Sequence, residues 1–394
     1  MIFNTVLRTF AKHICPEILI FSLIAFSAQL LNAQLRGPKY DERLLFRGMT
    51  GVAVGGEQQS WKLDSGEKVV QQSAPVTISL PLSNRILITM TNSAGISKLD
   101  TMKLQGIGDT RVGFSYVVPG DKVWINGGVN VPTGITKLTE SQLRVATILS
   151  QTAFGYRMPV YGQGINGNLG FAYAYTPRRR LVIGFGASFL YKGEYQPSSI
   201  GGSTDKYDPG DEISLNAGLD YTTFSKSERF SADATVTNYL PDKVNGQNFI
   251  QSGLRVMTMI VYSLKWGPTS HMIQVRMRLR TQSQIFSADS TQKFKSSQHY
   301  EFQYSASWFA MSWCTLAGIA EGKVYTGDQI PIGLGIFETG KAQIVSVGAE
   351  AGFTLLPSFV ISLNARYGTG SVVIDNIKNS VTGLEFGGGA RVQF

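Results

Sequence analysis

The chain of 394 residues contains very little cysteine and histidine. It has two cysteines and three histidines. Cys15 falls in the first 33 residues, which read as a removable leader, so Cys314 is the one thiol of the expected mature chain. A single thiol excludes an internal disulfide and a cysteine-based metal site. No zinc spacing, phosphate loop or calcium loop occurs in the sequence, and we expect no metal and no cofactor.

Long apolar runs are absent after residue 33. Residues 1–33 are typical of a secretory signal peptide: Arg8 and Lys12 give a positive start, an apolar run follows, and Ala33 is a small residue at the expected cleavage site. An uncleaved anchor is the alternative. Beyond this segment no run is long enough to span a membrane as a helix, although 43% of the residues are hydrophobic. The mean hydropathy of +0.00 therefore reflects apolar residues that are dispersed along the chain.

Charge of neither sign is concentrated in one segment. The 36 Lys and Arg residues exceed the 27 Asp and Glu residues, which gives a formal net charge of +9. A nucleic-acid-binding protein normally gathers its basic residues in one run or on one face. Because the basic residues here are scattered, we expect no nucleic-acid partner.

The last segment of the chain, 381–394, alternates strictly. Leu384, Phe386, Ala390, Val392 and Phe394 share one parity, and polar or small residues occupy the other. Successive side chains of a strand point to opposite faces, so this strand has one apolar and one polar face. Such a strand ending in an aromatic residue resembles the closing strand of bacterial outer-membrane barrels. The resemblance makes Phe394 the membrane-insertion terminus, and implies outer-membrane lipid and the barrel-insertion machinery as partners.

Short and long connections alternate along the whole chain. The short connections are 80–84, 119–121, 177–180, 226–228, 268–270, 312–313 and 357–358, and the longer polar ones are 97–107, 135–163, 198–210, 241–251, 287–297, 330–340 and 375–380. No span shows helix caps together with a 3.6-residue period, so we expect no helix. This rhythm predicts an all-β fold: a transmembrane antiparallel β-barrel with short periplasmic turns and longer extracellular loops.

The sequence divides into a signal peptide (1–33), an N-terminal segment (34–67) and the barrel (68–394). From residue 68 onward we count about fifteen strands, and a bacterial single-chain barrel needs an even number. Residues 46–56 would supply a first strand, which gives about sixteen strands in total. The alternative places residues 34–67 in the lumen as a plug and gives about fourteen strands.

The polar faces of the strands supply the expected lumen residues. Those with a possible role in selectivity are Asp109, Arg111, Arg255, Lys265, Arg276, Arg278, Arg280, Glu301, Glu350 and Arg366. Arg276, Arg278 and Arg280 alternate on one strand and form a ladder. This ladder either steers an anion such as a carboxylate or pairs with acids on adjacent strands. Met257 and Met259 either face the lumen beside it or, in a shifted register, face lipid.

Two glycine-rich motifs carry a family resemblance. Gly106, Gly108 and Asp109 stand in a strand motif Gly-Ile-Gly-Asp, and the sequence continues to Pro132-Thr133-Gly134. Together they resemble the outer-membrane proteins of the phenol-degradation meta-pathway type, which are related to FadL-like hydrophobic-compound transporters. The segment 48–54 is also similar to a FadL-like N-terminus, but the Asn-Pro-Ala that follows there is absent, which argues against a FadL-type hatch. The resemblance implies passive uptake of small hydrophobic or aromatic solutes.

The expected function is therefore a channel in the outer membrane of a Gram-negative bacterium, with loop 135–163 capturing the substrate or narrowing the lumen. The alternative is a non-transporting barrel with a structural or surface-assembly role. A secreted soluble β-protein is a third class. An enzyme is not expected, because His299, with Glu301 on the same face, is the one histidine near the outer rim. The sequence leaves the oligomeric state open.

Overall fold

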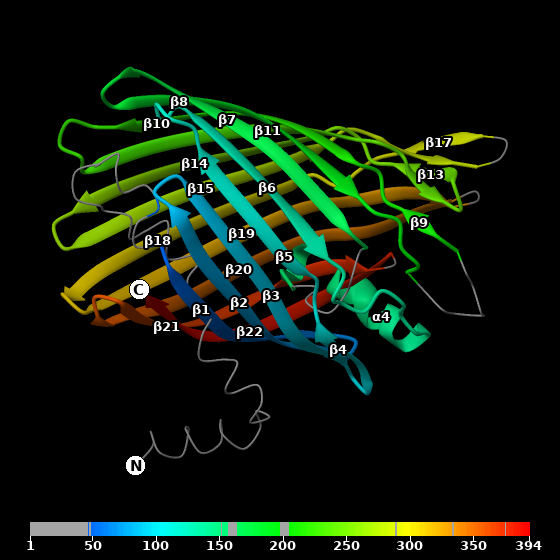
Figure 1. Ribbon diagram of the computed structural model, residues 1–394. Coiled ribbons are helices and arrows are strands. Elements are labelled where there is room, and N and C mark those ends of the chain that lie inside the picture. Colours follow the sequence, from blue (N-terminus) through cyan, green and yellow to red (C-terminus); the bar gives the residue numbers. More distant parts are fainter. Residues whose placement is uncertain are drawn as a thin grey trace, which may run out of the picture.

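The computed structural model describes residues 46, 49–150, 152–156, 164–197, 205–287, 290–332, 335–374 and 376–394. The expected signal peptide, 1–33, lies outside the described residues, as do residues 34–45. The dominant feature is one closed antiparallel barrel of 16 strands (Figure 1). Its strands are β1 (Gly51–Leu63), β2 (Lys68–Ser83), β3 (Ile86–Leu99), β5 (Thr110–Val117), β6 (Val123–Val131), β7 (Asn166–Arg178), β8 (Leu181–Lys192), β10 (Glu212–Thr222), β11 (Glu228–Tyr239), β14 (Arg255–Trp266), β15 (Thr269–Arg280), β18 (His299–Met311), β19 (Cys314–Ile332), β20 (Gly335–Leu356), β21 (Phe359–Ile374) and β22 (Ile377–Gln393).

The barrel closes between its first and last strands. β1 pairs with β22 without a register break, from Gly51 opposite Gln393 to Leu63 opposite Val381. The first strand begins at Gly51 and not at Phe46, so the expected strand at 46–56 is displaced toward the C-terminus. Residues 51–63 are part of the wall and do not form a lumen plug. The first strand is thereby paired with the last, as a sheet in a lipid environment requires.

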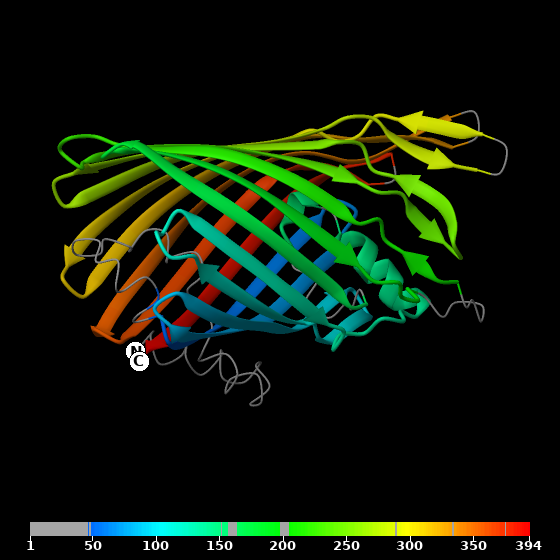
Figure 2. The same ribbon diagram turned by 45° about the horizontal axis from the view of Figure 1, so that its top comes forward.

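Short turns join the strands at one end, and the other end carries both short turns, such as that between β1 and β2, and long connections, such as that between β6 and β7 (Figure 2). The chain ends at the short-turn end. Three of the expected long loops were wrong, because they consist largely of strand. Segment 97–107 contains the end of β3 and the extra strand β4 (Met102–Ile107). Segment 330–340 belongs mostly to β19 and β20, and segment 375–380 to the start of β22. These segments are polar because they rise above the membrane. Their backbone still pairs across the hairpin, which side-chain polarity does not reveal.

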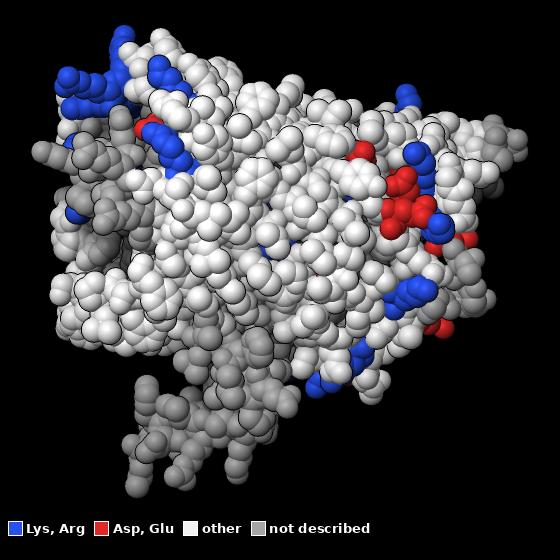
Figure 3. Space-filling view, viewed as in Figure 1, with Lys and Arg blue, Asp and Glu red and all other residues white. Residues whose placement is uncertain are grey.

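The outward faces form an apolar belt. Phe171, Leu215 and Val347 are each more than half exposed although they are apolar. On the face shown in Figure 3, the middle of the molecule is nearly free of charged residues, and charged residues gather toward both ends. A closed barrel with such a belt is a transmembrane barrel whose outer surface contacts lipid.

The long connections form structure of their own. β9 (Tyr207–Asp208), β12 (Asp242–Val244), β13 (Gln247–Gln251), β16 (Ser283–Phe286) and β17 (Thr291–Phe294) make a separate five-stranded sheet. It projects from the long-connection end of the barrel (Figure 2).

The connection between β6 and β7 contains a helix, contrary to the expectation of none. α4 (Glu140–Leu149) is followed by the 3₁₀ turn η2 (Thr152–Phe154). The helix starts at a capping box, in which the Thr139 hydroxyl accepts from Gln142 N and the Gln142 side chain accepts from Thr139 N. Val145 and Leu149, four residues apart, are buried on one face. The helix was missed because its apolar stripe is only three turns long and lies in a polar loop.

Candidate functional site in the barrel lumen

The register of the strands decides which side chains face the lumen, because directly opposed residues of an antiparallel pair lie on the same face. Arg276 is opposite Met259 on one side and Glu301 on the other. Arg278 is opposite Met257. Met257 and Met259 therefore lie on the same face as the arginines, as the inward-facing alternative requires. On β15 the alternate positions Val275, Met277 and Leu279 are apolar, which identifies the arginine face as the lumen side.

The arginine ladder has two kinds of member. Nη1 of Arg276 lies 3.1 Å from Oε2 of Glu301, whose other oxygen accepts a bond of 2.6 Å from the Tyr325 hydroxyl. Nη1 of Arg278 lies 3.4 Å from Nδ1 of His299. Within the described part of the chain no carboxylate forms an ion pair with Arg278 or Arg280. Arg276 thus pairs with an acid on an adjacent strand, which was one of the two alternatives for the ladder. Arg278 and Arg280 have no such partner among the described residues.

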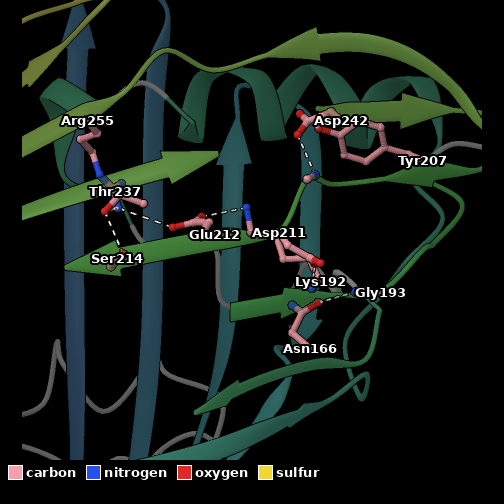
Figure 4. Close-up of polar contacts among 11 residues, drawn as sticks. Asn166, Lys192, Gly193, Tyr207, Asp211, Glu212, Ser214, Thr237, Asp242 and Arg255 are labelled. Atoms are coloured by element: carbon pink, nitrogen blue, oxygen red, sulfur yellow. Dashed lines mark hydrogen bonds and ion pairs between the residues drawn. The ribbon is translucent and has the colours of Figure 1, made fainter. Parts of the chain in front are cut away.

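A second group of charges sits where β8, β10, β11, β14 and β15 end, and we call it the rim cluster: Lys192, Glu212, Tyr239, Arg255 and Arg280. Nζ of Lys192 lies 2.8 Å from Oε1 of Glu212, and Nη2 of Arg255 lies 3.6 Å from Oε2 of the same carboxylate (Figure 4). The Tyr239 ring centroid is 5.7 Å from Nζ of Lys192, 5.3 Å from Cζ of Arg255 and 5.7 Å from Cζ of Arg280. Three cations therefore surround one ring, and two of them, Lys192 and Arg255, share one carboxylate.

The opposite wall, made by β1 and β19–β22, is richer in acids. Arg366 Nη2 lies 3.1 Å from Glu350 Oε1, and Lys323 Nζ lies 3.3 Å from Glu321 Oε2. A cavity of about 230 Å³ opens beside these pairs, and Glu57 and Glu385 also line it. Trp61 forms part of its wall by lying against Gly383, where a Cβ would come within 2.5 Å of the indole ring.

The helix α4 and the turn η2 form a plug over this wall. The plug buries Leu138, Val145, Leu149 and Phe154 in a shared apolar cluster. Among the described residues, every strand that contributes to the cluster is one of β1–β4 or β19–β22. The rings of Phe154 and Trp61 pack with centroids 5.3 Å apart. The plug therefore narrows the mouth from one side, and the rim cluster lies on the other wall.

Tyr156 anchors the chain just after the plug. Its hydroxyl donates a bond of 2.9 Å to the carbonyl oxygen of Val69 on β2. Burial raises the pKa of Tyr156 above the ordinary tyrosine value, because the phenolate would lose its hydration.

The two glycine motifs meet at a break in the wall. β3 pairs first with β4 and then with β5, and the chain between them, at Gly108 and Asp109, leaves the ladder. Gly106 has φ of 154°, a conformation that favours glycine. The Thr133 hydroxyl donates to the Gly108 carbonyl at 2.8 Å, and Asp109 Oδ1 accepts from Gly134 N at 3.1 Å. Pro132 directly follows the end of β6 and leads the chain into this contact.

The remaining predicted residues fall into three places. Arg111 is opposite Asn130, and Lys265 is opposite Ser270, both on inward faces. Asp109 holds the wall break together through its bond from Gly134 N, and its role in selectivity stays a prediction. Phe394 is exposed at the end of the last strand, where its N–H donates to the Thr50 carbonyl at 2.9 Å.

Glu212 and Tyr239 of the rim cluster were not predicted, although a signal for Glu212 was present. Ile213 and Leu215 alternate on the outer face, so the residue before them must face the lumen. Tyr239 ends a strand of mixed pattern. Its position among three cations depends on how β11 pairs with both neighbouring strands, and the sequence of one strand does not contain that information.

His299 lies in the lumen and not at a lipid-facing rim. Its ring stacks on Tyr325 with centroids 4.0 Å apart, and Arg278 is its other neighbour. The Tyr325 hydroxyl donates to Glu301 at 2.6 Å, and Arg278 is a cation, so the contacts of His299 do not pair it with a nucleophile as a base would be. In the described ranges no group of three or more His, Cys, Asp or Glu residues is arranged to hold a metal ion. The same ranges contain no helix long and apolar enough to span a membrane.

Comparisons with known proteins give distant likenesses only. No protein-family model and no curated protein sequence matches the chain. Among solved structures, it is similar to CdiB from Acinetobacter baumannii, with 11% identity over 87% of this chain and 60% of that chain, and a TM-score of 0.49. It thus spans 60% of the length of that relative.

Two further solved structures are named hydrocarbon channels. The CymD monoaromatic hydrocarbon channel has 10% identity over 88% of this chain and 89% of its own, with a TM-score of 0.38. The TodX monoaromatic hydrocarbon channel deltaS2 mutant has 9% identity over 88% of this chain and 90% of its own, with a TM-score of 0.44. Likenesses this distant do not bear on function.

Proposed function

We propose that this protein is a channel in the outer membrane of a Gram-negative bacterium, which admits small hydrophobic or aromatic compounds by passive diffusion. The observation that carries the proposal is the one-sided constriction of the lumen. The plug packs on β1–β4 and β19–β22, and Met257 and Met259 face the lumen from the other wall. Methionine side chains adapt to ligands of varied shape, so this wall offers apolar contact within a polar lumen.

The resemblance of the Gly106–Asp109 and Pro132–Gly134 motifs to outer-membrane proteins of the phenol-degradation type supports the same substrate class. The contact between Thr133 and Gly108 adds that the two motifs work as one structural unit. A diffusion channel needs neither a cofactor nor an energy source, and its contacts with solute have only to be weak and reversible.

Uptake into vesicles tests the proposal. The protein is reconstituted into vesicles whose outer leaflet contains lipopolysaccharide, which slows direct entry of apolar solutes, and entry of labelled 2-phenylethanol is timed. We expect faster entry than into empty vesicles. The variant Met257→Gln, Met259→Gln keeps side-chain length but removes the apolar surface, and should slow 2-phenylethanol while leaving the KCl conductance unchanged. An inserted barrel that gives no entry above empty vesicles contradicts the proposal.

A surface-assembly role is the competing proposal, and one observation favours it. The five-stranded sheet of the long connections projects beyond the barrel (Figure 2) and includes Phe249, an exposed aromatic residue. Deleting residues 242–251 tests this alternative, because a channel should keep its solute flux without them. Loss of surface assembly with intact flux would show that both roles exist.

A further inference from the structure

We propose that the rim cluster binds the carboxylate of a small aromatic acid, whose ring lies on Met257 and Met259. The inference rests on the proposed function and narrows it, because it names aromatic carboxylates as the favoured substrates. It follows from three features of one wall of the lumen: the surplus of cations, the distance from these cations to the methionines, and the acids across the lumen.

The cations of the rim cluster outnumber its acid. Lys192 and Arg255 both contact Glu212, whereas Arg280 lies against the Tyr239 ring and forms no ion pair with any carboxylate of the described residues. Arg280 is directly opposite Arg255 in the ladder. Two guanidinium groups on opposed positions repel each other, and a carboxylate between them removes that repulsion while accepting N–H bonds from both.

The apolar residues begin one step along the same strands. Met257 follows Arg255 by two residues, and Met259 by four, so both stand on the same face. Two residues of a strand span about 6.8 Å. If the carboxylate lies at Arg255 and Arg280, a ring joined to it by a one- or two-carbon linker therefore lies beside Met257. Arg278, opposite Met257, can lie against that ring, since guanidinium groups favour aromatic faces.

The facing wall disfavours an anion. The cavity on that side is lined by Glu57, Glu321 and Glu385 against Lys323 and Arg366. Arg366 is also bonded to a fourth acid, Glu350. An anionic solute is thus attracted to one wall and repelled by the other, which orients it as it passes the plug.

Binding is tested first, separately from transport. The detergent-solubilised full chain is titrated calorimetrically with phenylacetate and with 2-phenylethylammonium, which have the same carbon skeleton and opposite charge. We expect phenylacetate to bind more tightly. The variant Arg255→Gln, Arg280→Gln should weaken phenylacetate binding by about tenfold, the effect of losing a charge-assisted hydrogen bond. The variant Arg280→Lys keeps the charge but loses the paired N–H donors of the guanidinium. Its affinity for phenylacetate should lie between those of the parent and the double variant.

The matched control removes one guanidinium from the other wall. Arg391 lies on β22, opposite Val360 of β21. Neither strand contributes to the rim cluster, so Arg391→Gln changes the lumen charge without altering that cluster. We expect Arg391→Gln to bind phenylacetate as the parent does. Heat-modifiable migration in gels confirms that each variant is a folded barrel.

Three results would overturn the inference: equal affinity for the two probes, unchanged phenylacetate affinity in the Arg255→Gln, Arg280→Gln variant, or an equal loss in Arg391→Gln. Vesicle entry of both probes and of neutral 2-phenylethanol then separates this inference from the proposed function. Binding of phenylacetate without entry of any solute defeats the channel proposal alone. Entry of 2-phenylethanol without preference for phenylacetate defeats the aromatic-acid proposal alone.

Discussion

The hydroxyl of Thr133 donates a hydrogen bond of 2.8 Å to the carbonyl oxygen of Gly108, across 25 residues of sequence. It also accepts from Thr110 N at 3.0 Å, and the two threonine hydroxyls lie 3.0 Å apart. Asn92 Nδ2 reaches Thr110 Oγ1 at 2.8 Å. Each of these donors therefore has an acceptor within one hydrogen-bond network. This network replaces the backbone ladder bonds that are missing between β4 and β5.

Thr133→Val should destabilise the barrel. Valine has the shape of threonine but leaves the Gly108 carbonyl and Thr110 N without this partner, which costs about 0.5–1.5 kcal/mol because water still reaches these groups. The measurement is the free energy of unfolding in urea with the protein in lipid vesicles. Thr133→Ser keeps the hydroxyl and is the matched control. Equal stability of the valine variant and the parent would mean that the hydroxyl network contributes nothing.

Phe154→Ala should loosen the plug. Phe154 is 1% exposed and packs on Trp61, so its truncation leaves a cavity that costs about 3–5 kcal/mol. Because the plug is attached to the wall mainly by such contacts, we expect a larger single-channel conductance in planar bilayers. Leu143→Ala, on the exposed face of α4, is the control and should conduct as the parent does. A conductance unchanged by Phe154→Ala would place the constriction elsewhere.

Alkaline pH should also loosen the plug, through ionisation of Tyr156. Its pKa is raised on folding by burial, so the stabilisation is complete below the ordinary tyrosine pKa of 10.0 and is lost as the pH rises above it. We expect the conductance to rise reversibly above pH 10.0. Tyr156→Phe removes the ionisable group along with its bond to Val69, and should conduct more at neutral pH without the alkaline rise. An alkaline rise that persists in Tyr156→Phe would assign the effect to another group.

Deletion of Phe394 should reduce assembly in cells. The resemblance to outer-membrane closing strands makes this aromatic terminus a recognition signal, and its exposed ring makes few contacts that would stabilise the finished barrel. The expected result is less heat-modifiable barrel in the membrane fraction with unchanged stability of what does fold. Phe224→Ala, which removes another exposed phenylalanine at a short turn, is the control. Normal assembly without Phe394 would exclude the signal.

The sequence predicted the strands of the barrel wall better than the plug and the contacts between side chains in the lumen. Phe386 and Val392 alternate with Glu385 and Arg391, and this period of two is set by the strand backbone whatever its neighbours are. The same period, read on β10, would have found Glu212. The capping box at Thr139 and the buried pair Val145 and Leu149 were readable too, but a short helix in a polar loop gives no sign of which surface it will cover.

The sequence by itself determined the β-barrel, the short turns at one end, and the alternation of apolar and polar side chains along most strands, because these depend on local periodicity and turn residues. Only the tertiary structure decided that the plug covers β1–β4 and β19–β22, that Arg276 is paired with Glu301 while Arg280 meets Tyr239, and that Thr133 closes the break at Gly108. These contacts depend on register between strands and on the path of a long loop. Both are set by packing among residues that are distant in the sequence.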